Sequence, residues 1–143
     1  MSGNGPEYDR LVKLTKNLEL EKYISLPGWV EKEELKNLFR NAHIFIFPKW
    51  WIEYGSAVLT EAISYGLPAI VPAGGALEWL SKGAAIPFTS DSIENLSEQM
   101  ERIGNNAALR ISLAEGSRAR IAALDCKTLT KKLELAIQSV KHS

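Results

Sequence analysis

Two short apolar runs, with a helical segment between them, constrain what this chain can fold into. The first run covers residues 43–47 and the second covers residues 69–71, and a proline follows each of them. Gly55 and Ser56 open the intervening helical segment, which ends at Gly66. Runs that are nearly all apolar are typical of parallel strands with helices on both faces. This order of strand, helix and strand predicts an α/β fold, a Rossmann-like open parallel sheet with helices on both faces.

The start of the helical segment predicts an anion site. Ser56 is a good helix N-cap, and the backbone N–H groups of a first helical turn, at the positive end of the helix dipole, suit a phosphate. Glu53 precedes this start in the loop, and Glu61 follows about five residues into the helix. A carboxylate accepts two hydrogen bonds at once, which is what a pair of ribose hydroxyls requires. The spacing alone leaves two interpretations open: a site for a nucleotide-diphosphate donor, or a loop acid and a solvated helix acid.

The composition excludes several classes of protein. The 143 residues include 17 basic and 17 acidic side chains, so the chain carries no net charge. That balance argues against a nucleic-acid-binding surface, which needs excess positive charge. Cys126 is the only cysteine, which excludes an internal disulfide and fits a reducing compartment. The sequence has no apolar run near the ~20 residues of a membrane span and no signal-peptide core, so we expect a cytoplasmic protein with no evident membrane association.

The remaining elements are predicted from apolar periodicity. Residues 7–20 and 31–41 have apolar side chains at helical spacing, and residues 21–26 between them are expected to form a short strand. A short helix is expected at 77–80, and an edge strand that tolerates proline at 84–88. Three amphipathic helices are expected to follow, at 91–103 with Ser90 or Asp91 as cap, at 105–123 and at 128–140.

A larger pattern surrounds the two acids. Seven residues separate Glu53 from Glu61, and a Gly-Leu-Pro triplet follows at 66–68. A Gly-Gly-x-x-Glu turn at 74–78 comes shortly after the second apolar run. Together these motifs resemble the retaining group 1 glycosyltransferases of the GT-B fold, which are glycogen-synthase-like.

Two upstream stretches are similar to the same family. Residues 3–6 resemble the turn after the second strand of its C-terminal domain, and residues 23–30 resemble the third strand and its loop. The resemblance implies a truncated C-terminal nucleotide-sugar-binding domain, incomplete at its N-terminus. We therefore expect a single partial donor-binding domain over residues 1–143, with a Rossmann-like core at about 1–90 and a helical tail at 91–143.

The resemblance also implies roles for individual residues in retaining transfer of a sugar from a nucleotide diphosphate to an acceptor. Glu53 is expected to be catalytic and to contact the sugar, and Glu61 to bind the ribose. Trp29 is expected either to stack on the base or to pack at its loop. No metal or other cofactor is expected, because the chain has no Asp-x-Asp motif. The expected donor-binding residues are Tyr54, Gly55, Ser56, Ala57, Glu61, Gly28, Trp29, Gly74 and Gly75.

The resemblance finally implies a missing partner. Members of the family have two domains with the active site between them, and neither the acceptor-binding domain nor the first two strands of the donor domain has a counterpart here. We expect a separate acceptor-domain polypeptide, or a homodimer through an exposed strand edge, and little activity for the chain alone. The alternatives are a catalytically inactive nucleotide-binding subunit, a truncated remnant, or a related GT-B nucleotide-sugar epimerase.

Overall fold

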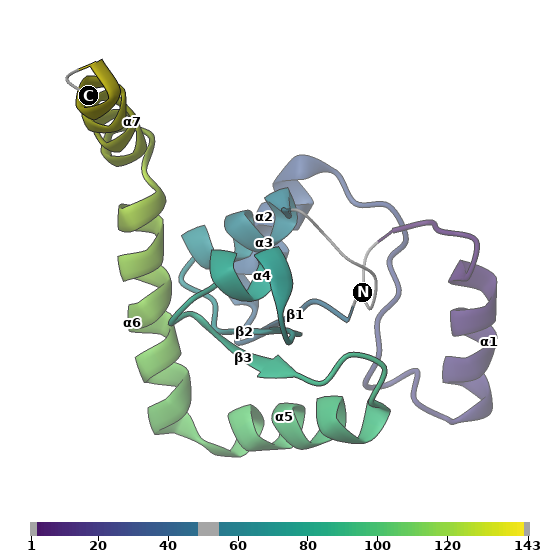
Figure 1. Cartoon of the computed structure of the whole chain (residues 1–143). Helices are drawn as coiled ribbons and strands as arrows, with labels where there is room; N and C mark the ends of the chain where they lie inside the picture. The colour runs from purple at the N-terminus through teal and green to yellow at the C-terminus, as the bar shows by residue number, and fades with distance from the viewer. Residues whose placement is uncertain (1–2, 49–54, 142–143) are drawn as a thin grey trace. The chain divides into compact units, whose positions relative to one another are not determined.

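The chain forms two compact units, which a computed structural model describes over residues 3–48 and 55–141. The first unit, Met1–Asn41, contains helices α1 (Tyr8–Asn17) and α2 (Lys32–Asn41). The second, Ala42–Ser143, contains the sheet and the later helices (Figure 1). Helices α1 and α2 confirm the helices predicted near these positions. The predicted single domain with a helical tail from residue 91 stays a prediction.

Residues 21–26 of the first unit form no strand, so that prediction is wrong. The N–H groups of Tyr23 and Ile24 both donate to the carbonyl oxygen of Leu20 at 2.9 Å, which makes a helical turn where extended backbone was expected. Tyr8 Oη then donates to the carbonyl oxygen of Leu26 at 2.8 Å. A strand needs a neighbouring strand to bond its backbone groups, and the described residues of this unit provide none.

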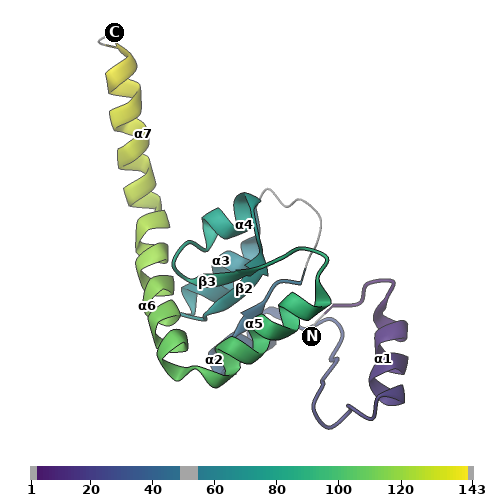
Figure 2. The ribbon, with the colours of Figure 1, turned by 60° about the horizontal axis from the view of Figure 1, so that its bottom comes forward.

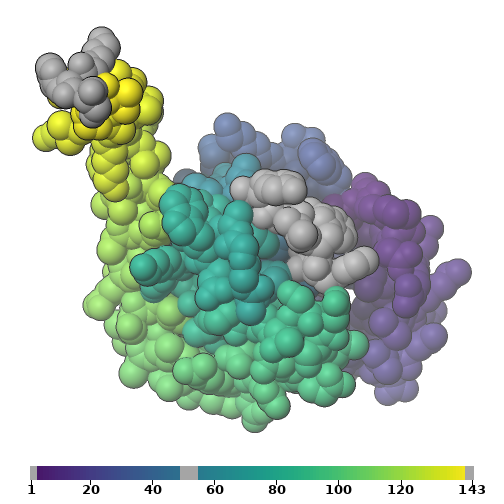
Figure 3. All heavy atoms as spheres, in the orientation of Figure 1, coloured from purple at the N-terminus to yellow at the C-terminus, as the bar shows by residue number. Residues whose placement is uncertain are grey.

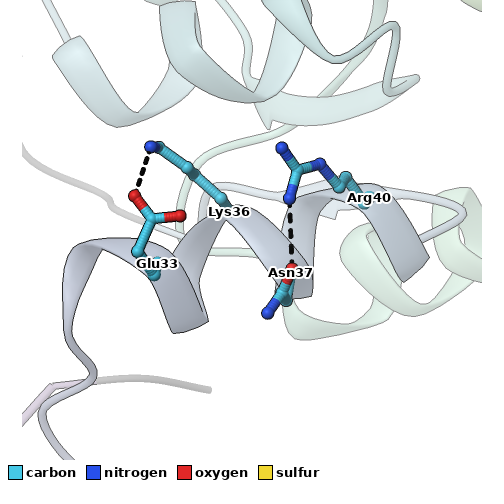
Figure 4. Close-up of polar contacts among 4 residues, drawn as sticks. All are labelled: Glu33, Lys36, Asn37 and Arg40. Carbon is cyan, nitrogen blue, oxygen red and sulfur yellow. Dashed lines mark hydrogen bonds and ion pairs between the residues drawn. The ribbon is translucent and has the colours of Figure 1, made fainter.

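Helix α2 carries two polar pairs. Lys36 Nζ donates to Glu33 Oε1 at 2.5 Å, and Arg40 Nη1 donates to Asn37 Oδ1 at 3.2 Å (Figure 4). Each pair joins residues three apart, which lie next to one another on a helix surface. The hydrogen bond from Lys36, together with its positive charge, lowers the pKa of the Glu33 carboxyl below its ordinary value.

The second unit is organised by a parallel sheet in the order β1-β2-β3, which confirms the predicted fold class. The strands are β1 (Phe45–Ile46), β2 (Ala69–Pro72) and β3 (Ala85–Phe88), with β2 in the centre. Strand β3 is an edge, as expected for a strand with a proline. Its carbonyls at Ala84 and Phe88 bond toward β2, so Pro87, which has no N–H, faces the open side.

Apolar clusters cover the two faces of this sheet. One holds side chains of α3 (Ala57–Ser64) and α4 (Gly75–Leu80) against β2, and the other holds α5 (Ile93–Asn105) and α6 (Ala107–Leu124) against β2 and β3 (Figure 1). In both clusters the packed residues recur at helical or strand spacing, which is why the sequence predicted these elements. The first cluster includes Leu59, Ile63, Val71 and Leu77, and the second includes Ile70, Ile86, Phe88, Ile103 and Leu113.

The later helices start close to their predicted positions. The cap of α5 is neither Ser90 nor Asp91: Ser92 Oγ accepts from the N–H of Asn95 at 3.1 Å, while Asp91 has a left-handed φ of 66°. The last helix, α7 (Cys126–Lys141), follows α6 after one residue and continues beyond the sheet (Figure 2). The predicted helix positions are therefore confirmed, and the predicted α5 cap is wrong.

Candidate functional site

The start of α3 has the geometry that the sequence predicted. Ser56 is the N-cap in extended backbone, and its Oγ accepts from the N–H of Leu59 at 3.2 Å. Thr60 closes the first turn by donating its N–H to the carbonyl of Ser56 at 3.1 Å. The N–H groups of Ala57 and Val58, the first two residues of α3, have no protein acceptor among the described residues. The helix start therefore offers two backbone donors and the positive end of the dipole.

Of the two predicted acids, Glu61 lies in the described part of the structure and Glu53 does not. Glu61 is half-buried one turn into α3, with Ala57 one turn before it and Tyr65 one turn after. Glu53 and Tyr54 lie outside the described residues, so their roles stay predictions. Glu61 therefore lies on α3 itself, about 6 Å along the helix axis from Ala57 at the helix start.

A glycine turn lies at the same edge of the sheet. Gly74 and Gly75 have φ of 82° and 74°, in the left-handed region that side chains disfavour. The turn leads from the carboxyl end of β2 into α4, and Glu78 Oε2 accepts from the N–H of Gly74 at 2.5 Å. Because parallel strands end at one edge and α3 follows β1 as α4 follows β2, the α3 start and this turn share the carboxyl edge of the sheet.

Gly28 and Trp29 belong to the first unit and are held there by Asn4. Asn4 Oδ1 accepts from the N–H of Trp29 at 3.0 Å, and Gly3 donates its N–H to the carbonyl of Gly28 at 2.6 Å. Gly28 has a φ of 76°, and a Cβ there would lie 2.5 Å from Asn4 Oδ1. Trp29 is 74 % exposed, so it does not pack at its loop in the way one interpretation expected. That Trp29 belongs to the same binding site as the start of α3 stays a prediction.

A recess that the sequence analysis did not foresee lies between α4 and β3. Its volume is about 120 Å³. Glu78 and Lys82 bring one carboxylate and one ammonium group to its wall, four residues apart in the chain. No local motif signals such a recess, because its wall combines a helix with the strand that follows it. The lining residues are Val71, Glu78, Ser81, Lys82, Gly83, Ala85 and Pro87.

Two features are absent from the described residues. Over 3–48 and 55–141, no three His, Cys, Asp or Glu side chains gather closely enough to hold a metal ion. In the same ranges, no helix combines the length and hydrophobicity needed to cross a bilayer. The expectation that no metal takes part stays a prediction.

Several solved glycosyltransferase structures share this fold. Sucrose-phosphate synthase from Thermosynechococcus elongatus superposes with a TM-score of 0.77 at 22 % identity, over 99 % of this chain and 38 % of that one. Anabaena Alr3699/HepE in complex with UDP gives 0.80 at 16 % identity, over 96 % of this chain and 40 % of that one. The pneumococcal O-GlcNAc transferase GtfA, in complex with UDP and GlcNAc, gives 0.65 at 21 % identity, over 99 % and 29 %. The chain thus spans well under half of each of these structures.

Comparison at the level of sequence identifies the family. No curated protein matched the chain. The profile of the family described as "Glycosyl transferases group 1" matches residues 1–120, which is most of the chain and includes the α3 start and the glycine turn. The fold of the chain agrees with that of the GT-B enzymes described above. The chain therefore belongs to the group 1 glycosyltransferases and has the parallel-sheet fold of the GT-B enzymes over part of their length.

Proposed function

We propose that this chain is the donor-binding part of a retaining glycosyltransferase and that it binds a nucleoside-diphosphate sugar. The observation that carries the proposal is the capped start of α3 at the carboxyl edge of the sheet, where the N–H groups of Ala57 and Val58 have no protein acceptor among the described residues. Backbone donors at the positive end of a helix bind phosphates without further charge. Structures with the same fold bind UDP or UDP-glucose.

In this proposal the donor lies along the carboxyl edge from its diphosphate to its sugar. The diphosphate is bound by the α3 start, to which Gly55, Ser56 and Ala57 belong. Glu61 accepts the two ribose hydroxyls, because a carboxylate offers an acceptor for each. Glu53 and Tyr54 contact the sugar side, as does the turn at Gly74 and Gly75. For Gly28 and Trp29, in the first unit, the proposed role is contact with the base, for which the exposed indole offers a stacking surface.

The transfer step itself needs more than these residues. Positive charge must stabilise the leaving diphosphate, and an acceptor must be held opposite the sugar. We propose that a further acceptor-binding polypeptide or a second copy of this chain supplies these groups. Without that complement, the chain binds the donor and turns it over slowly or not at all. We also propose a cytoplasmic location and a reaction without a metal ion.

Calorimetric titration of the chain with UDP, GDP and ADP tests the donor site. We expect at least one nucleotide to bind, and Glu61→Gln to weaken that binding about tenfold, because the amide keeps the size of the side chain but accepts from only one hydroxyl. Glu101→Gln is the matched control: Glu101 is an exposed helical glutamate on α5, and its replacement should leave affinity unchanged.

The outcomes separate the proposal from its alternatives. If wild type and Glu61→Gln bind all three nucleotides equally weakly, the nucleotide assignment is wrong. If nucleotides bind but no sugar reaches an acceptor when the complementing polypeptide is added, the chain is a binding subunit. An epimerase would change the sugar of the donor with no acceptor present, which chromatography of the nucleotide sugars would detect.

A further inference from the structure

The carboxylate of Glu78 fixes the backbone of the glycine turn from one side. Its Oε2 accepts from the N–H of Gly74 at 2.5 Å, while the N–H of Ala73 donates to the carbonyl of Phe88 at 2.7 Å. Two successive peptide units are therefore tied down, one to β3 and the next to α4. Glu78, the fourth residue of α4, holds the second of them.

This bond also decides where the carbonyl of Ala73 points. The peptide unit that joins Ala73 to Gly74 is planar and trans, so its C=O is antiparallel to its N–H. Because the N–H is directed at Glu78, the carbonyl oxygen of Ala73 is directed the opposite way. Ala73, Gly74 and Gly75 are all exposed, and a Cβ added at either glycine would meet nothing within 4 Å. The turn thus presents a fixed acceptor beside open space.

We propose that Glu78 is a positioning residue of the donor site, which orients the peptide unit of Ala73 and Gly74 so that its carbonyl accepts from a hydroxyl of the donor sugar. This inference rests on the proposed function. A sugar hydroxyl is both donor and acceptor, so an oriented carbonyl is a suitable partner. Glu78 itself does not touch the sugar: it lines the recess between α4 and β3 and acts through the backbone.

The two glycines explain why a separate positioning group is needed. A backbone with φ of 82° and 74° at consecutive glycines is open to many other conformations, because glycine has no Cβ to restrict it. The peptide unit would rotate among these conformations without a partner for its N–H. Glu78 supplies that partner, and a glutamine at the same position would supply one too, because its amide oxygen accepts in the same way.

The test compares nucleotide and nucleotide sugar on the full chain. Calorimetry with UDP, GDP and ADP, and with the glucose conjugate of each, gives the factor by which the sugar raises affinity. We expect Glu78→Ala to reduce this factor about fivefold and to leave the affinity for the nucleotide alone unchanged, with Glu78→Gln keeping most of the factor. Glu94→Ala is the matched control, because it removes an exposed first-turn glutamate from α5.

The outcomes distinguish a positioning role from a structural one. An equal loss of nucleotide and nucleotide-sugar affinity in Glu78→Ala, or no loss of the factor, overturns the proposal. Loss of the factor in Glu78→Gln to the same extent as in Glu78→Ala also overturns it. If wild type binds none of the six compounds, the proposed function fails first and this inference fails with it. The amide proton of Gly74 in NMR spectra reports the bond directly: its downfield shift should be lost in Glu78→Ala and kept in Glu78→Gln.

Discussion

At the scale of single residues, Gly116 shows how tightly α6 fits the turn before β3. A Cβ on Gly116 would overlap the backbone carbonyl oxygen of Gly83, and a backbone atom cannot swing aside as the end of a flexible side chain can. Glycine inside a helix costs about 1 kcal/mol relative to alanine, so helix propensity alone favours Gly116→Ala. We expect the overlap to win and the substitution to lower the free energy of unfolding by about 2 kcal/mol in urea denaturation.

The control for this prediction is a second helical glycine. Gly104, in the last turn of α5, has nothing within 4 Å of an added Cβ. Gly104→Ala should leave the free energy of unfolding unchanged or raise it by up to about 1 kcal/mol. A Gly116→Ala variant as stable as Gly104→Ala would show that α6 is not in contact with the Gly83 turn.

Residue-level prediction from sequence succeeded where the cause is local. The cap at Ser56 was predictable because its partner, the N–H of Leu59, is three residues away. The partners of Ser117 and Arg120 on α6 were not predictable, because they are carbonyls far along the chain. Ser117 donates to Leu67 and Arg120 donates to Leu80, across 50 and 40 residues. Such contacts follow from the packing of α6, which no short motif encodes.

At the scale of elements, periodicity predicted each helix found in the described residues, and it predicted one strand that these residues do not form. Strands β1 and β2 were recognisable because both are apolar throughout and end at prolines. Residues 21–26 also end before a proline, yet residues 21–23 form a turn and residues 24–26 form no regular element. A helix satisfies its own backbone, whereas a strand depends on a neighbour that the local sequence cannot reveal. Likewise, the roles proposed for Glu53 and Glu61 depend on contacts with a ligand, which the local sequence cannot reveal.

Helix α2 gives a prediction about pH. The hydrogen bond and charge of Lys36 hold the pKa of the Glu33 carboxyl below its ordinary 4.5. Because the folded-state pKa is lowered, the pair contributes stability that is fully present above the unfolded pKa. This contribution is lost as pH falls through the folded-state pKa. An NMR titration of the Glu33 side chain should give a lowered midpoint, and Lys36→Gln should raise it. An ordinary midpoint in wild type would contradict the bond.

At the scale of the whole molecule, burial is unevenly divided between the two units. In the described part of Met1–Asn41, only Thr15, Gly28 and Phe39 are buried. The second unit has both apolar clusters, and all four residues of β2 are buried. Its last helix, α7, leaves the side chains of Leu133, Leu135 and Val140 exposed, and Figure 3 shows it extending past α6. The stability of the chain should therefore be concentrated around β2.

Native-state hydrogen exchange tests this concentration of stability. The amides of β2 should exchange slowest, through global unfolding, whereas those of α1 and α7 should exchange orders of magnitude faster through local opening, because little apolar area holds either helix. Ile70→Val removes one methylene from a fully buried side chain of β2 and should lower the free energy of opening there by about 1 kcal/mol. Exchange in α1 should not change, since α1 opens without unfolding the sheet. Equal protection of α1 and β2, or an equal response of both to Ile70→Val, would mean that the two units unfold as one.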